Sequence, residues 1–161
     1  MDKLYIIIPA YNEQENIKNV IMDWYPVVEK IGGGSKLVII DDGSRDATYQ
    51  IMQEAARDLA AFEPITKPNS GHGATVLYGY KYAIEQGADY IFQTDSDGQT
   101  VPEEFWQFWE MRDSYDMVIG LRKGRQDGMS RIFVTKTLKL VLWLCFHVII
   151  PDANTPFRLM K

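Results

Sequence analysis

The stretch LYIIIPAYNE, residues 4–13, decides the fold, because an unbroken apolar run gives way at once to a polar turn. Residues 4–8 are typical of a parallel strand that is buried on both faces of a sheet. The same arrangement recurs in LVIIDDGS, residues 37–44, and in YIFQTDSDGQ, residues 90–99. Ligands of open parallel sheets bind outside the carboxyl ends of the strands, so these three polar strand ends predict one shared binding site.

Amphipathic segments separate these apolar runs. Helical spacing of apolar residues predicts one helix from residue 12 or 13 toward residue 30 and a second that Ser44 or Asp46 caps. Further helices are expected over residues 73–86, 102–111 and 132–150, and further strands over residues 62–65 and 117–120, with a polar loop at 122–131. Strands that alternate with helices predict an α/β fold, a Rossmann-like doubly wound and mostly parallel sheet with helices on both faces.

Composition limits the classes of protein that this chain can belong to. The 161 residues suffice for a single domain, expected over residues 1–161. A net charge of −5 argues against a nucleic-acid binder, which needs a basic face. The single cysteine, Cys145, excludes an internal disulfide and a cysteine-based zinc cluster. The most apolar stretch, residues 140–150, is far shorter than the roughly 20 residues that a membrane-spanning helix needs.

The pair Asp95 and Asp97 indicates a metal site. Residues two apart on an extended backbone point to the same side, and two carboxylates aimed together need a cation between them. Hard divalent cations, Mg²⁺ or Mn²⁺, take oxygen ligands and leave room for phosphate oxygens, and the carbonyl of Gln99 would add one more ligand. The alternative is an ordinary turn after a strand, which Asp and Gly often form.

The other two strand ends indicate a nucleoside site. An acidic residue after the second strand, such as Asp42, suits a ribose hydroxyl or a base edge, as in the Rossmann fold, although Asp-Gly is also an ordinary turn. Tyr11 has the shape to stack on a base, or to be a half-buried aromatic. The glycine-rich fingerprint of dinucleotide binders is absent after the first strand, which argues against that class.

Five motifs together resemble those of the family 2 glycosyltransferases, above all the branch of dolichol-phosphate mannose synthase and other polyprenyl-phosphate sugar transferases. They occur in the family's order along the whole chain: IPAYNE at 8–13, DDGS at 41–44, NSGHG at 69–73, DSDGQ at 95–99 and DANTPFR at 152–158.

The resemblance implies a GT-A fold and an inverting transfer of a sugar that depends on Mg²⁺ or Mn²⁺. The donor would be a UDP- or GDP-linked sugar, and the acceptor a polyprenyl (dolichol-type) phosphate. Such a reaction belongs to the synthesis of cell-envelope glycans. It also implies site residues. The nucleoside would lie along Pro9, Ala10, Tyr11 and Glu13, with Asp42 on the base or ribose. Asp95 and Asp97 would hold the metal and the diphosphate, with Gln99 assisting. The acceptor phosphate would meet Arg122, Arg131 and Arg158, and Arg125 is a weaker match.

Two residues depart from the family's pattern. His72 stands where many relatives have lysine or arginine, which lowers the positive charge near the diphosphate or makes it depend on pH. Pro156 stands where glycine is common. An anionic phosphate acceptor needs no strong general base, whereas a sugar hydroxyl does. For that case Asp152 is a weak candidate, and a loop or cap residue is an equally good interpretation.

Several alternatives remain open on the sequence alone. The chain could be a non-catalytic nucleotide-sugar-binding domain, or a glycosyltransferase that acts on a saccharide hydroxyl. We expect a cytoplasmic protein that works at the cytoplasmic face of a membrane, and a chain truncated at its C-terminus. The apolar segment 136–150 would either lie on the membrane surface or pack in a core.

Overall fold

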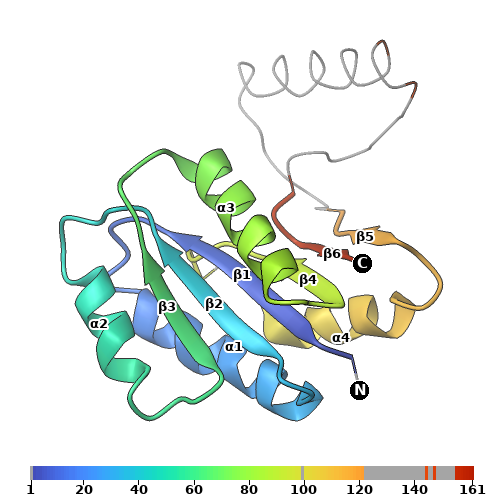
Figure 1. Ribbon diagram of the computed structural model, residues 1–161, viewed down its shortest axis with the longest axis horizontal. Helices are drawn as coiled ribbons and strands as arrows, with labels where there is room; N and C mark the ends of the chain where they lie inside the picture. Colours follow the sequence, from blue (N-terminus) through green and yellow to red (C-terminus); the bar gives the residue numbers. More distant parts are fainter. Residues whose placement is uncertain (1, 99, 122–143, 145–146, 148–154) are drawn as a thin grey trace. The chain divides into compact units, whose positions relative to one another are not determined.

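A six-stranded sheet forms the centre of the structure, a computed structural model that describes residues 2–98, 100–121, 144, 147 and 155–161 (Figure 1). The strand order is β3-β2-β1-β4-β6-β5. The strands are β1 (Leu4–Ala10), β2 (Lys36–Asp41), β3 (Phe62–Thr66), β4 (Tyr90–Gln93), β5 (Met117–Ile119) and β6 (Arg158–Met160). The helices are α1 (Ile17–Ile31), α2 (Thr48–Ala55), α3 (His72–Glu85) and α4 (Pro102–Met111).

The first four strands are parallel, and β1, β2 and β4 are deeply buried. All seven residues of β1 are buried, and β1 pairs in parallel with β2 on one side and with β4 on the other. β3 continues the sheet in parallel beyond β2. The chain therefore reverses its direction of winding between β1 and β4, which is where doubly wound sheets open a ligand site. The expected α/β sheet, mostly parallel, is confirmed.

Helices cover both faces of the sheet, as Figure 1 shows. α1, α2 and α4 pack on one face, where Trp24 of α1 meets the rings of Phe92, Phe105 and Phe157 at centroid distances of 5.4, 6.5 and 6.1 Å. α3 packs on the other face against Ile7 and Ile40. The larger apolar cluster thus lies between the sheet and the first group of helices.

Helix α1 begins at Ile17, four or five residues later than expected. The reason lies in contacts with Ser44, which precedes α2, and with Thr48, the first residue of α2. The backbone N–H groups of Asn12 and Glu13 donate to Ser44 Oγ at 2.9 Å and to Thr48 Oγ1 at 2.8 Å, and Asn12 has a positive φ of 54°. These bonds hold residues 12–16 as turns between the first strand and the helix.

Strand β6 was not expected from the sequence. It pairs antiparallel with β4, so that Arg158 lies opposite Gln93 and Leu159 opposite Phe92. Three residues are too few to show a periodic pattern, and their place in the sheet depends on a partner more than 60 residues away in the chain.

The chain divides into two compact units, residues 1–118 with 157–161, and residues 119–156. The first contains the four parallel strands, β6 and the four helices. Most of the second, including the expected loop 122–131, nearly all of the expected helix 132–150, and Cys145, lies outside the described residues. Within the described part of the chain, no helix is both long and apolar enough to cross a membrane.

Candidate functional site

The end of β1 supplies one wall of the site. Pro9 and Ala10 close the strand, and Tyr11 follows with 44% of its surface exposed. The turn after Tyr11 is held by the bonds from Asn12 to Ser44 and from Glu13 to Thr48 at the start of α2. The tyrosine ring is therefore accessible on a backbone that is fixed on both sides, as a stacking platform requires.

Two neighbouring carboxylates at the end of β2 have different roles. Asp41 is turned into the protein, where its Oδ1 accepts the Ser44 N–H at 3.1 Å and its Oδ2 accepts the Thr66 hydroxyl at 2.7 Å. Asp42 points the other way and lines the cleft described below. Its carboxylate accepts the N–H groups of Ser70 and Gly71, each at 2.9 Å, and pairs with the Lys67 ammonium.

Asp42 remains charged in this setting. Burial alone would raise the pKa of its carboxyl group. Hydrogen bonds from Lys67, from the Ser70 and Gly71 amides and from the Thr75 side chain outweigh that effect, and the pKa lies below its ordinary value.

The end of β4 supplies the third wall. Asp95, Ser96 and Asp97 follow the strand, and the Asp95 Oδ1 lies 3.8 Å from His72 Nε2 at the start of α3. Two carboxylates on the same short segment thus lie at the carboxyl edge of the sheet, as the sequence predicted.

These strand ends enclose a cleft of about 450 Å³ at the point where the sheet reverses its winding. The lining residues come from the ends of β1, β2 and β4 and from the start of α3: Pro9, Ala10, Tyr11, Glu13, Asp42, Asn69, Gly71, His72, Thr75, Asp95, Ser96 and Asp97. The structure therefore brings together the residues that were assigned to the nucleoside and both aspartates that were assigned to the metal.

Sequence reasoning assigned no role to four lining residues: Asn69, Gly71, Thr75 and Ser96. Asn69, Gly71 and Ser96 belong to motifs that the resemblance identified, so a signal for them existed. Thr75 carries no such signal, because a threonine one turn into a helix is common at surfaces.

The charge of the cleft decides what it can bind. The described lining contains four carboxylates, those of Glu13, Asp42, Asp95 and Asp97, and no lysine or arginine. A phosphorylated ligand would be repelled from such a surface unless a cation came with it. Asp95 and Asp97 are the kind of donor pair that Mg²⁺ uses together with phosphate oxygens. Within the described residues, no group of three or more histidine, cysteine, aspartate or glutamate side chains is placed to hold a metal ion.

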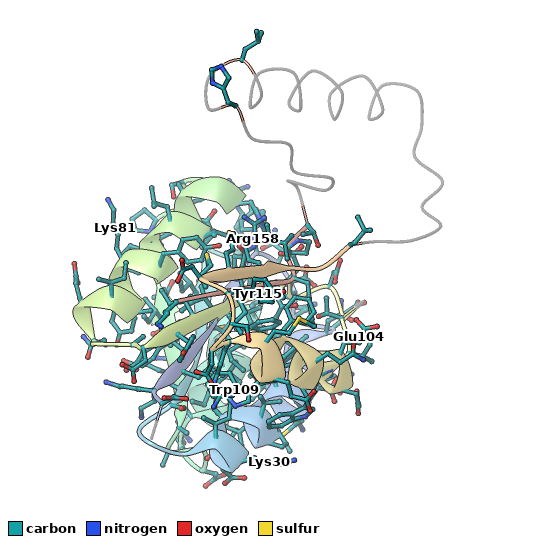
Figure 2. The ribbon with its side chains drawn as sticks, turned by 90° about the vertical axis from the view of Figure 1, so that its right-hand side faces the viewer. Lys30, Lys81, Glu104, Trp109, Tyr115 and Arg158 are labelled. Carbon is teal, nitrogen blue, oxygen red and sulfur yellow. The ribbon has the colours of Figure 1, made fainter. Side chains whose placement is uncertain are left out.

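Arg158, one of the arginines assigned to the acceptor, does not line the cleft. It lies on β6, labelled in Figure 2, opposite Gln93, whose side chain accepts a hydrogen bond from the Tyr80 hydroxyl. Burial raises the pKa of Tyr80, and the nearby Arg158 guanidinium partly offsets this. The remaining assigned residues, Gln99, Arg122, Arg125, Arg131 and Asp152, lie outside the described residues.

Comparison with known sequences identifies the family and the relatives that this chain resembles. The sequence model of the family described as "Glycosyl transferase family 2" matches residues 5–156. The undecaprenyl-phosphate 4-deoxy-4-formamido-L-arabinose transferase of Pectobacterium atrosepticum is 29% identical over 140 residues, which cover 85% of this chain and 42% of that protein. The protein of the same name from Salmonella paratyphi B is 29% identical over 143 residues, covering 87% and 43%. The resemblance to the polyprenyl-phosphate branch is confirmed, and the chain spans less than half the length of these curated relatives.

Solved structures give the fold. The glucosyl-3-phosphoglycerate synthase of Mycobacterium tuberculosis, in complex with Mn²⁺, UDP-glucose and phosphoglyceric acid, matches 99% of this chain and 56% of its own with a TM-score of 0.70 at 18% identity. The mannosyl-3-phosphoglycerate synthase of Rubrobacter xylanophilus matches 99% and 53% with a TM-score of 0.71 at 12% identity. The expected GT-A fold is confirmed. Because the family model spans nearly the whole chain and the fold agrees with it, the chain belongs to glycosyl transferase family 2.

Proposed function

We propose that this protein transfers a sugar from a nucleoside-diphosphate sugar to a polyprenyl phosphate, with a divalent metal ion and with inversion at the anomeric carbon. The observation that carries the proposal is the placing of Asp95 and Asp97 in the same cleft as the Pro9–Tyr11 wall and Asp42. Membership of family 2 supports the reaction class, and the names of the curated relatives support the acceptor class.

The donor would lie across the cleft. Tyr11 would stack on the base, the ribose would lie toward the end of β2, and the diphosphate would lie toward Asp95 and Asp97, which are suited to hold Mg²⁺ or Mn²⁺. A solved relative in fold carries Mn²⁺ with UDP-glucose, which supports this choice of metal and of donor class. When bound, the metal supplies positive charge for the leaving diphosphate.

The chemistry needs little from the protein beyond position and charge. An acceptor phosphate oxygen forms a bond to the anomeric carbon while the bond from that carbon to the diphosphate oxygen breaks, and the electron pair leaves with the nucleoside diphosphate. Attack from the face opposite the leaving group inverts the centre. The acceptor is already anionic, so no general base is required. A lipid acceptor would bring the protein to the cytoplasmic face of a membrane.

Titration of UDP and GDP, each with and without Mn²⁺ or Mg²⁺, tests the donor site. We expect one nucleotide to bind in a metal-dependent way, and Asp97→Ala to weaken it by at least about tenfold, since a charged contact is worth roughly 1.5–3 kcal/mol. Asp89→Ala is the matched control, because Asp89 accepts the Lys3 N–H at 2.8 Å at the opposite end of the sheet. Equal binding without metal, or by Asp97→Ala, would refute the metal site; binding of neither nucleotide would refute the donor site.

The acceptor is tested in the same preparation by supplying the sugar conjugate of whichever nucleotide binds. Transfer to undecaprenyl phosphate, with the opposite anomeric configuration in the product, is the expected result. Transfer only to a free saccharide would assign the acceptor to the hydroxyl class, and retained configuration would contradict inversion.

A further inference from the structure

Asn12 lies between two residues that line the cleft, Tyr11 and Glu13, but is not itself part of the described lining. Its φ of 54° lies in the left-handed region, where a residue other than glycine stays only if surrounding contacts compensate. We propose that Asn12 is a positioning residue for nucleoside binding, because it ties the end of β1 to the loop after β2 and thereby fixes Tyr11 relative to Asp42. The inference rests on the proposed function, since it assigns Asn12 to the donor site of that reaction.

Asn12 is bonded to the loop after β2 in both directions. Its N–H donates to Ser44 Oγ at 2.9 Å, and its Oδ1 accepts the Arg45 N–H at 2.9 Å. These partners lie 32 and 33 positions away in the chain, so the bonds join two strand ends and do not merely complete a local turn. One bond uses the main chain of Asn12 and the other its side chain, and together they fix both the position and the orientation of the residue.

Tyr11 is held on both sides by contacts between the same two strand ends. Before it, the Ala10 carbonyl oxygen accepts the Asp42 N–H at 2.8 Å, and after it Asn12 is bonded to Ser44. Ser44 follows Asp42 by two residues, so both bonds lead to the chain segment that carries the second residue assigned to the nucleoside. The position of the Tyr11 backbone relative to Asp42 therefore depends on these two attachments.

Asp42 has its own support from the other side. Residues 67–71, here called the 67–71 loop, connect β3 to α3, and two N–H groups of this loop donate to the Asp42 carboxylate, each at 2.9 Å. The segment after β2 is therefore fixed independently of the end of β1. Asn12 passes this fixed position on to Tyr11.

Loss of the Asn12 side chain should leave the start of α1 in place. The N–H groups of the next two residues donate to Thr48 Oγ1 at 2.8 Å and to Asp46 Oδ2 at 3.2 Å, so the turn that leads into the helix has attachments of its own. The change should therefore reach the nucleoside through Tyr11 and leave the helix folded.

Amide hydrogen exchange without any nucleotide tests the structural claim. We expect Asn12→Gly, which allows the same φ without strain, to raise exchange of the Arg45 amide at least about threefold, because that amide loses its acceptor. Asn12→Asp keeps an oxygen acceptor and should retain the wild-type protection. Asn19→Ala, at an exposed position of α1, is the matched control and should change nothing at Arg45. Wild-type exchange in Asn12→Gly would overturn the proposal.

A double-variant cycle tests the consequence for binding. The nucleotide that binds the wild type, with Mn²⁺, is titrated into Tyr11→Ala, Asn12→Gly and the double variant. Because bases stack favourably on aromatic rings, we expect Tyr11→Ala to weaken binding by at least about tenfold and Asn12→Gly by about fivefold. If Asn12 acts through Tyr11, the double variant binds no more than about twofold more weakly than Tyr11→Ala.

The outcomes separate this inference from the proposed function. Losses that multiply to about fiftyfold in the double variant would show that Asn12 does not act through Tyr11, and would overturn the inference while the donor site stands. If the wild type binds neither UDP nor GDP, the proposed function fails and the role in binding fails with it, and exchange of the Arg45 amide still decides whether Asn12 joins the two strand ends. Ser44→Ala removes the other bond of the pair and should repeat the effects of Asn12→Gly in both measurements; wild-type behaviour of Ser44→Ala would contradict the proposal.

Discussion

Gly43 lies where the 67–71 loop crosses the end of β2. Its φ is +70°, and a Cβ atom built on it would lie 2.9 Å from the Asn69 nitrogen and 3.2 Å from the Lys67 carbonyl oxygen. Both neighbours are backbone atoms that the bonds to Asp41 and Asp42 hold in place. A side chain at this position therefore meets two costs, an unfavourable backbone conformation and a direct overlap with the loop.

We expect Gly43→Ala to lower the free energy of unfolding more than Gly87→Ala does. Gly87 has a φ of +71°, and a Cβ atom built on it has no neighbour within 4 Å. Gly87→Ala should therefore lower the free energy of unfolding only by the conformational cost of about 1–2 kcal/mol. The overlap at Gly43 should add about 1–3 kcal/mol. Urea unfolding of the two variants measures the difference, and equal losses would show that the loop yields to the methyl group.

At the scale of elements, helix α3 approaches the sheet at a glycine. A Cβ on Gly79 would lie 2.4 Å from Ile7 Cγ2 and 2.7 Å from Ile40 Cδ1, so the helix axis could not come this close with a larger residue. The start of α3 lines the cleft with His72 and Thr75, which means that this packing distance also sets the position of one cleft wall.

We expect Gly79→Ala to destabilise the protein by about 1–3 kcal/mol, although alanine is the better helix former by about 1 kcal/mol. Gly73→Ala, in the same helix but with nothing within 4 Å, should leave stability unchanged or raise it. Ile40→Val removes one of the overlapping atoms, so its cost combined with Gly79→Ala should be less than the sum of the two. Denaturant unfolding of the four variants checks these signs; a stabilising Gly79→Ala would mean that the helix shifts freely.

The elements also show what a sequence can and cannot predict. The strands β1, β2 and β4 follow apolar runs, and the carboxylates at their ends share one edge because parallel topology requires it, so the fold and the aspartates of the cleft were predictable. The start of α1 was not, because bonds from Asn12 and Glu13 to residues more than 30 positions away compete with the helix. The network around Asp42 was hidden for the same reason, since it depends on the directions of the Ser70 and Gly71 N–H groups.

At the scale of the whole molecule, two separate networks make stability depend on pH. Asp42 is bound by the 67–71 loop, and Asp46 accepts the Thr48 and Gln14 N–H groups at 3.0 and 3.2 Å near the start of α2. Burial alone would raise the pKa of each carboxyl, and in each case the hydrogen bonds outweigh it and lower the pKa below 3.8. The folded protein therefore binds fewer protons than the unfolded chain in acid.

The free energy of unfolding should accordingly be highest above pH 3.8 and fall as the pH drops through the lowered folded-state values. We expect Asp42→Asn to reduce stability near neutral pH and to make its decline in acid less steep, because one of the two titrating groups is gone. Asp46→Asn should act in the same direction, and the two effects should add, since the networks share no partner. Urea unfolding between about pH 7 and pH 3 measures the slopes. If the free energy of unfolding of the double variant falls in acid as steeply as that of the wild type, other groups govern acid unfolding. If the two substitutions reduce this steepness additively, the acid sensitivity of the fold lies at the two loops that connect β2 to α2 and β3 to α3.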